Sequence, residues 1–212
     1  MTLAFSSLLP DVVTHAPGAT DPIALHYLRL SAIDFCEQTS LWTELLPAAV
    51  ALTSTSFPLT LTSTLSYAQV IRLGDVFWND VRLYPWAAAH GSETTTNWRA
   101  LTGTPKLFQT LDARTMTVTP LPDEAGDLTV QLVLAPTLTA DEMEESVLQR
   151  YREGIIAGAL SRLCAVPNQT FSNSAALPLY SQVFAAAVHE GRSEAHTGYT
   201  SAPMMVRLRP FA

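Results

Sequence analysis

The hydrophobic pattern of this 212-residue chain changes twice, which divides the chain into a helical start, a β-rich middle and a helical end. Residues 1–45 and 137–197 carry apolar side chains at intervals of three and four, the spacing that places them on one face of a helix. Residues 46–136 lack that period and are rich in Thr, Val and Leu, a composition that favours strands over helices. The sequence therefore predicts helices at both ends and a β-rich region inserted between them.

The first strong helix signal begins at Asp21 and Pro22 and extends to about Gln38. Aspartate is frequent at helix starts, and a proline in the first turn costs no hydrogen bond because its nitrogen would have no partner there. The apolar stripe of this helix consists of Leu25, Leu28, Ala32, Phe35 and Cys36. We expect residues 1–20 to form a short helical turn followed by a loop.

Segments with strand character fill the middle region. They are residues 49–55, 69–73, 76–83, 106–111, 116–119 and 127–134. The last segment has the clearest alternation of a half-buried strand, carried by Leu128, Val130, Leu132 and Leu134. Turn residues separate the segments, including Gly74-Asp75 and an expected hairpin tip at residues 123–126. The pattern predicts antiparallel hairpins in a small sheet or sandwich.

Two more helices are predicted after the β-rich region. Thr139 and Glu142 have the spacing of a capping box, so the first of these helices should begin at Thr139 and end before Pro167. The second should extend from about residue 174 to residue 195. It places Pro178 in the first turn, where a proline is tolerated.

Two glycines in the first of these helices, Gly154 and Gly158, lie four residues apart. Each costs ~1 kcal/mol of helix propensity relative to alanine, so we expect a packing reason for both. Together with the small neighbours Ala157 and Ser161, they predict a groove for the close approach of another helix. The pattern leaves open whether that helix belongs to the same subunit or to a neighbouring one.

The last residues of the chain, 198–212, predict an extended C-terminal tail. Apolar and basic side chains alternate there as they do in a strand. Such a strand needs a partner, either the chain's own sheet or the edge of another subunit. The candidate binding residues of this tail are Tyr199, Met204, Val206, Arg207, Leu208, Arg209 and Phe211.

These elements together predict an α+β fold. Residues 1–45 and 137–197 should form one helical bundle, residues 46–136 an inserted antiparallel β-rich layer that projects from it, and residues 198–212 the extended tail. We expect one compact domain overall, because 212 residues lie within the range of a single domain.

Charge and cysteine content narrow the function classes. A net charge of −7 argues against a protein that binds free nucleic acid through a basic face, but it allows a channel wall past which DNA slides. Cys36 and Cys164 have neither metal-ligand spacing nor a disulfide framework, so we expect both to be small buried residues. The first residues lack a basic stretch followed by an apolar run, and no apolar run reaches membrane-spanning length, so we expect neither a signal peptide nor a membrane partner.

The sequence contains no arrangement that predicts catalysis. Its five histidines lack the spacing of metal ligands, and no nucleophile, base and orienting group form a recognisable set. We therefore expect no enzymatic activity, no cofactor and no metal. The tryptophans allow an alternative function, a β-sheet module that binds carbohydrate through Trp78 and Trp86.

Several short segments of the chain, taken in their order and spacing, resemble those of a known protein family. They are residues 5–13, 16–18, 32–39, 41–42, 134–136, 151–154, 158–160 and 209–211. Together they resemble a family of small head-to-tail connector proteins, the adaptors of short-tailed phages. The β-rich middle matches this family poorly, and no single segment is specific by itself.

The resemblance implies a structural virion protein. Adaptors of this kind form a ring of about twelve copies beneath the portal protein, extend the DNA channel and contact the next tail or nozzle protein. Their C-terminal segments commonly engage the portal, a role that would fall here to residues 198–212. We therefore expect a protein made in the host bacterial cytoplasm and built into the neck of the virion, where genomic DNA passes without sequence recognition. A neck or tail-completion protein at another level is the alternative within this class.

Overall fold

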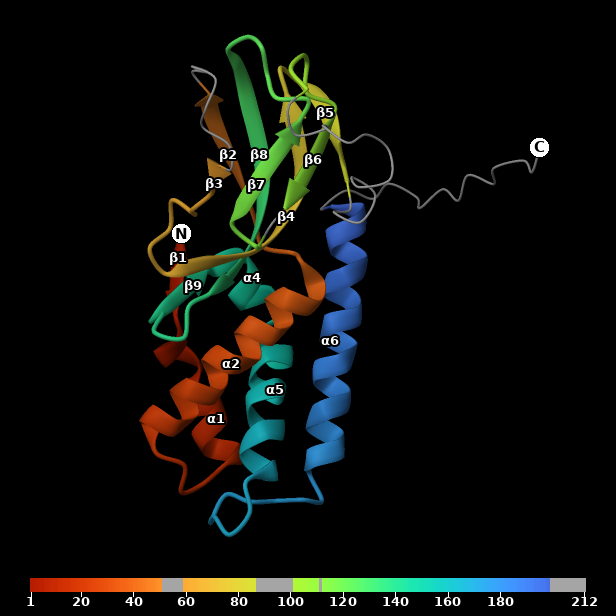
Figure 1. The fold of residues 1–212 in the computed structure, drawn as a ribbon. Helices are drawn as coiled ribbons and strands as arrows, with labels where there is room; N and C mark the ends of the chain where they lie inside the picture. Colours follow the sequence, from red (N-terminus) through yellow and green to blue (C-terminus); the bar gives the residue numbers. More distant parts are fainter. Residues whose placement is uncertain (51–58, 87–100, 111, 199–212) are drawn as a thin grey trace, which may run out of the picture. The chain divides into compact units, whose positions relative to one another are not determined.

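A computed structural model of the chain describes residues 1–50, 59–86, 101–110 and 112–198 (Figure 1). Its backbone packing separates two compact units, one formed by Met1–Leu41 with Glu142–Ala212 and the other by Trp42–Asp141. The first unit contains the helices and a two-stranded ribbon, and the second contains a seven-stranded sheet. We call them the helical unit and the sheet unit.

The helical unit is built from both ends of the chain. Its elements are β1 (Thr2–Ala4), the 3-10 helix η1 (Phe5–Leu8), α1 (Leu9–His15), α2 (Asp21–Thr39), β9 (Glu142–Glu144), α4 (Glu145–Arg150), α5 (Arg152–Ala165) and α6 (Leu177–Thr197). Helices α5 and α6 run in opposite directions side by side, as Figure 1 shows. Strands β1 and β9 pair antiparallel, with Leu3 opposite Met143, so the first residues of the chain are hydrogen-bonded to the segment that precedes α4.

Helix α2 lies close to its expected position. Pro22 is in the first turn, and the buried side of the helix includes Leu28, Ala32 and Phe35. The helix ends where Ser40 adopts a left-handed conformation with φ 54° and donates its backbone N–H to the carbonyl of Cys36. That arrangement satisfies a carbonyl that the helix itself leaves unpaired.

The helix expected from Thr139 to Pro167 is instead a strand followed by two helices. Residues Glu142–Glu144 form β9, α4 ends at Arg150, and α5 begins at Arg152 after a break at Tyr151. The side chain of Glu142 accepts a hydrogen bond from the Thr2 hydroxyl at 2.8 Å, so it is not the capping residue that the local sequence predicts. Pairing with β1, a segment 140 residues away, overrides the local helix signal.

The sheet unit contains the remaining strands. They are β2 (Thr43–Val50), β3 (Leu59–Thr60), β4 (Ala68–Trp78), β5 (Val81–Pro85), β6 (Leu107–Thr110), β7 (Thr115–Thr119) and β8 (Gly126–Pro136). Their order in the sheet is β2-β8-β4-β5-β6-β7-β3, and neighbouring strands are antiparallel except for the parallel pair β5 and β6. The sheet curls into a half-barrel.

The predicted fold class, a helical bundle with a small inserted β-layer, is wrong. The protein has a mixed α/β fold in which the large curled sheet is a structural unit in its own right. The physical reason is that β8 pairs with both β2 and β4 along most of its length. The curled sheet also has an apolar core of its own, formed by the fully or almost fully buried Val76, Leu83, Met116, Val118, Leu128, Val130 and Leu132.

Two expected turns in the sheet unit have different structures. Gly74-Asp75 lies inside β4, at a register shift against β8 between Leu73 and Val76, where a side chain on Gly74 would meet Gln131. Residues 123–126 do not close a hairpin, because β7 and β8 are not neighbours in the sheet. The tight hairpin joins β4 to β5 through Asn79 and Asp80, whose positive φ angles of 46° and 63° are typical of a two-residue turn.

We predict that Leu132→Ala lowers the free energy of unfolding by about 2–5 kcal/mol, because the Leu132 side chain is fully buried and its truncation leaves a cavity. Leu45→Ala on β2 is the matched control, since the Leu45 side chain is 64% exposed and its loss should cost less than about 0.5 kcal/mol. Urea denaturation followed by circular dichroism measures both variants. Equal effects would contradict the sheet's having its own core.

Candidate functional site: an apolar groove between helices α5 and α6

The helical unit carries an open apolar groove of about 570 Å³ between α5 and α6, beside α1. Ile156, Ala157 and Leu160 of α5 form its floor, and all three are buried. Leu179, Tyr180 and Val183 from the first two turns of α6 form one wall. We call this set of six residues the α5–α6 groove. Its volume lies in the range of binding sites rather than of packing defects.

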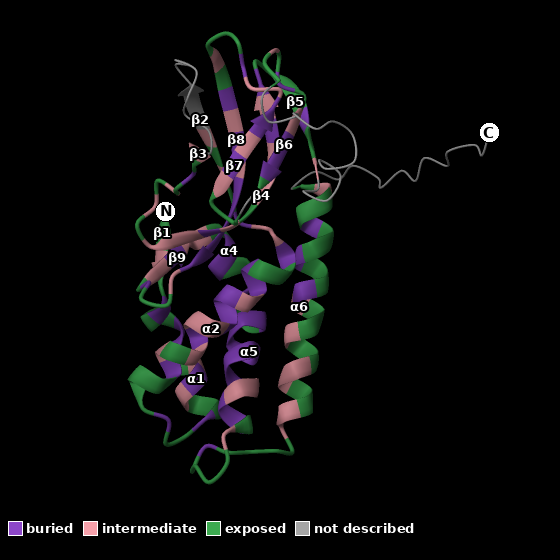
Figure 2. Ribbon diagram, in the orientation of Figure 1, coloured by how far each residue is buried: buried purple, intermediate pink, exposed green. Residues whose placement is uncertain are grey.

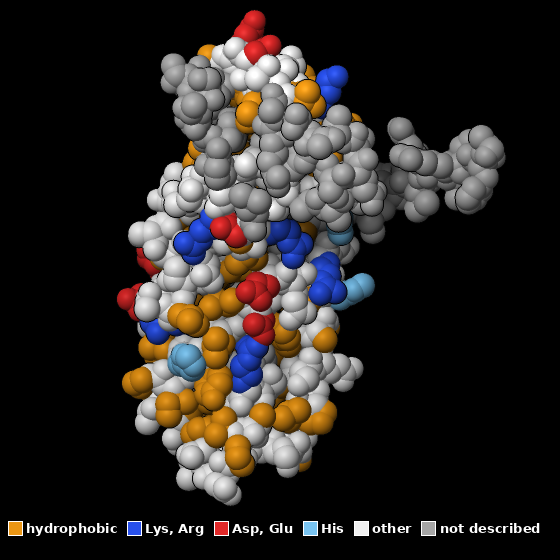
Figure 3. All heavy atoms as spheres, viewed as in Figure 1, with side chains coloured by type: hydrophobic (Ala, Val, Ile, Leu, Met, Phe, Trp, Pro, Cys, Tyr) orange, Lys and Arg blue, Asp and Glu red, His pale blue; other side chains and the backbone are white. Residues whose placement is uncertain are grey.

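The wall formed by α6 leaves large apolar side chains open to solvent. Leu179 is 60% exposed and Val183 is 38% exposed. Figure 2 shows that most of α6 is exposed or only partly buried, and the buried residues of this helix are Val188, Gly191 and Glu194. In Figure 3, hydrophobic side chains gather on the visible face of the helical unit, including the region of the first turns of α6. Neighbouring exposed apolar groups of this kind are typical of a surface that a protein partner covers.

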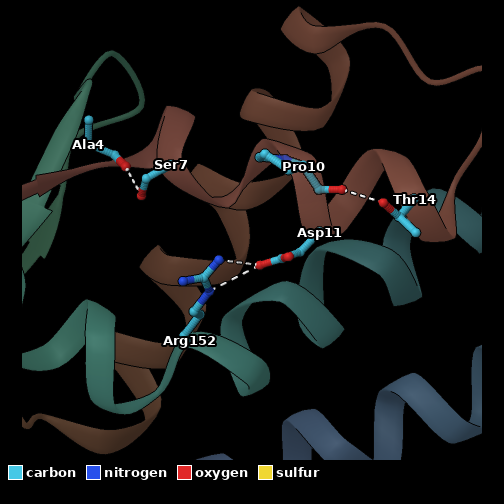
Figure 4. Close-up of polar contacts among 6 residues, drawn as sticks. All are labelled: Ala4, Ser7, Pro10, Asp11, Thr14 and Arg152. Carbon is cyan, nitrogen blue, oxygen red and sulfur yellow. Dashed lines mark hydrogen bonds and ion pairs between the residues drawn. The ribbon is translucent and has the colours of Figure 1, made fainter.

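Charged and aromatic side chains border the groove. Arg152 of α5 donates from Nε to the Asp11 carboxylate of α1 at 3.0 Å, and Figure 4 shows the two side chains pointing toward each other. The rings of His15 and Tyr180 meet edge to face, with their centroids 6.3 Å apart. Glu153 lies exposed on the same border. An exposed ion pair contributes at most about 1 kcal/mol to the free energy of unfolding, so the pair between Asp11 and Arg152 mainly orients α1 against α5.

Gly154 and Gly158 lie where α5 approaches other helices of the same chain. A Cβ atom on Gly154 would overlap Ala187 of α6. A Cβ atom on Gly158 would overlap Ser31 of α2 and come within 2.7 Å of Phe184 on α6. The hydroxyl of Ser31 donates to the carbonyl of Ile155 at 2.7 Å, a polar contact between α2 and α5.

The other two predicted packing residues have different surroundings. Ala157 is buried in the floor of the α5–α6 groove. Ser161 is half-buried, and its hydroxyl donates to the carbonyl of Gly158 at 2.9 Å within α5. The four residues therefore lie on one helix without forming a single surface: the glycines meet helices of their own chain, and Ala157 faces the groove.

A buried polar cluster fastens the junction of α4 and α5 to α6. The phenol of Tyr151 donates to the carboxylate of Glu194, which also pairs with Nε of Arg150 at 2.9 Å. Burial, together with the hydrogen bond to Glu194 and the charge of that group, raises the pKa of Tyr151. Sequence reasoning missed this cluster, because Tyr151 and Glu194 are 43 residues apart and no local pattern connects them.

The seven candidate residues of the C-terminal tail lie outside the described part of the chain, which ends at Gly198. They are Tyr199, Met204, Val206, Arg207, Leu208, Arg209 and Phe211. Of the two tryptophans considered for carbohydrate binding, Trp78 is 4% exposed and lies against Gly126, and Trp86 is half-buried. The buried ring of Trp78 offers no surface on which a sugar could stack.

The described residues contain no group of three or more His, Cys, Asp or Glu side chains that could hold a metal ion. Cys36 and Cys164 are buried free thiols, and burial raises the pKa of both. Across the described ranges, no helix has the length and apolar character needed to cross a membrane.

Comparison with protein-family models gives no match to this chain, and comparison with curated proteins gives none either.

We predict that Gly158→Leu destabilises the protein by about 1–3 kcal/mol or more, because the new side chain overlaps Ser31 and Phe184. Ala185→Leu, at an exposed position of α6, is the control that adds a leucine without overlap. Urea midpoints measure both variants. If Gly158→Leu matched its control, the close approach of these helices would be disproved.

We predict that the burial of the Tyr151 phenol and its hydrogen bond to Glu194 make the protein's stability fall at alkaline pH. The pKa of Tyr151 is raised in the folded state, so only the unfolded chain releases this proton as the pH rises through ~10. Tyr151→Phe should therefore be less stable than wild type by about 1–3 kcal/mol at pH 7, since Glu194 loses a donor. The difference in unfolding free energy between the two proteins should shrink above pH ~10, because only wild type loses the stabilisation that the Tyr151 phenol provides.

Urea unfolding at a series of pH values measures this gap. Tyr84→Phe, at a side chain that is 64% exposed, is the control and should follow wild type throughout. A gap between Tyr151→Phe and wild type that stayed constant to pH 11 would show that the phenol does not carry the effect.

Proposed function

We propose that this protein is the adaptor subunit of a phage head-to-tail connector, a ring of about twelve copies beneath the portal that continues the DNA channel. The observation that carries the proposal is the exposed apolar wall of the α5–α6 groove, formed by Leu179 and Val183. The resemblance of both ends of the chain to adaptors of short-tailed phages is the second support for the proposal.

The groove has the composition of a protein interface. Its floor is apolar and buried, and its border carries the Asp11–Arg152 ion pair and Glu153. An apolar centre with a polar rim is the usual arrangement of such contacts. In a ring, one face of each subunit contacts a different face of the next, so a groove on one side of the helical unit suits a heterologous contact.

The charge of the chain fits a DNA channel better than a DNA-binding site. A net charge of −7 gives little attraction to phosphates, so the genome would pass without sequence recognition or tight binding. In this proposal, residues 198–212 engage the portal, and another surface contacts the next tail or nozzle protein. The protein acts without a cofactor and catalyses no reaction.

A neck or tail-completion protein at another level of the virion would use the same kind of surface, and the experiment below separates the two roles. The carbohydrate-binding alternative would depend on the half-buried Trp86, since Trp78 is buried.

We predict that electron microscopy of the protein mixed with the portal ring from the same genome shows a stoichiometric collar on the tail-facing side of the portal. Deletion of residues 198–212 should leave the protein folded but the portals bare, and Arg207→Glu with Arg209→Glu should weaken docking about tenfold or more. Circular dichroism checks the fold of each variant.

Val183→Asp should reduce collar formation, because it places a charge in the apolar wall of the groove. Ile23→Asp is its control, at an α2 side chain that is 39% exposed outside the groove. Bare portals beside folded wild-type protein at micromolar concentration would contradict the adaptor role.

A further inference from the structure

We infer that the α5–α6 groove of the free protein binds residues 199–212 of its own chain, so that the tail covers the ring contact until the portal takes it up. The inference rests on the proposed function for the identity of the later partner. The contact itself concerns only this chain and is testable without a portal.

The groove needs an occupant before assembly, because its apolar wall is open. Leu179 is 60% exposed and Val183 is 38% exposed beside the buried floor of Ile156 and Leu160. A subunit that presented this surface at high concentration would associate before it met a portal. An occupant from the same chain would prevent that association.

The segment after Gly198 is long enough to reach the groove. Helix α6 rises ~1.5 Å per residue, so Thr197 lies about 21 Å along the axis from Val183. An extended segment covers that distance in about six or seven residues, at ~3.3 Å each. A tail that turns back at Gly198 therefore reaches the groove at about residue 205, and residues 206–212 remain to occupy it.

The side chains at the end of the tail complement the groove. In an extended segment, successive side chains point to opposite faces, so Val206 and Leu208 can face the apolar floor while Arg207 and Arg209 face its border. The border carries the carboxylates of Asp11 and Glu153 against the single guanidinium of Arg152. Phe211 supplies a large apolar anchor of the kind that fills such grooves.

A tethered segment has an advantage over a second copy of the protein. A short flexible link gives an effective local concentration of about millimolar, well above the micromolar concentration of free subunits. The tail of the same chain therefore occupies the groove first in dilute solution. Because binding of one partner and release of the other are linked, docking of the tail on the portal frees the groove for the next subunit. Ring formation would then begin only at the portal.

The test uses the full chain with a nitroxide spin label attached at Ala212→Cys. The native thiols Cys36 and Cys164 are buried, so the label reacts at the new cysteine. We predict selective broadening of the methyl signals of Leu179 and Ile156 in the NMR spectrum, independent of protein concentration. The broadening should be lost in Val183→Asp and in Arg207→Glu with Arg209→Glu.

Ile23→Asp is the matched control and should keep the broadening, because Ile23 belongs to a separate apolar hollow with Tyr27 and Phe171. A mixture of labelled chains with unlabelled, isotope-enriched chains separates the two sources of the tail. Broadening in the mixture would show that a second copy occupies the groove and would overturn the inference, as would the absence of broadening in the labelled chain.

These outcomes are distinguishable from failure of the proposed function. A collar on the portal without broadening would keep the adaptor role and disprove the self-contact. Broadening without a collar would keep the self-contact and disprove the portal as the partner that releases it.

Discussion

The close approach of α5 to α2 and α6 determines the arrangement of the helical unit. Side chains on Gly154 and Gly158 would overlap Ala187, Ser31 and Phe184, so α2 and α6 approach α5 this closely because α5 carries no side chain at these two positions. The contacts at these two glycines, together with the hydrogen bond between Tyr151 and Glu194, hold α6 against α5. The first turns of α6 then stand beside Ile156 and Leu160, and the groove is the space that remains between them.

The sheet unit is stabilised by a separate set of contacts. Strand β8 lies between β2 and β4, and its residues Leu128, Val130 and Leu132 are fully buried. The glycine at position 74 allows Gln131 to approach β4, where its side-chain oxygen accepts the N–H of Asp75 at 3.4 Å. Such bulges bend a sheet, which is consistent with the curl of this one.

The proposed function connects the groove, the tail and the low charge of the chain. A subunit that must remain separate until it meets a portal has to cover its apolar contact surface and still be able to expose it. In this proposal, an occupant held by modest apolar and charged contacts would satisfy both needs, because a portal that bound the tail more strongly would displace it.

The sequence by itself determined the local elements whose signals lie within a few residues: the start of α2 at Asp21-Pro22, the placement of Pro178 in the first turn of α6, the alternation of β8 and the small residues of α5. These signals reflect backbone sterics and side-chain periodicity, which act locally. Only the tertiary structure decided that Glu142–Glu144 is a strand, that β5 and β6 are parallel and that the sheet is a unit of its own. The tertiary structure also decided the position of the groove, because Asp11 and Arg152 on its border are 141 residues apart in the sequence. Contacts between distant segments depend on which surfaces the chain can bury together, and no local pattern encodes that choice.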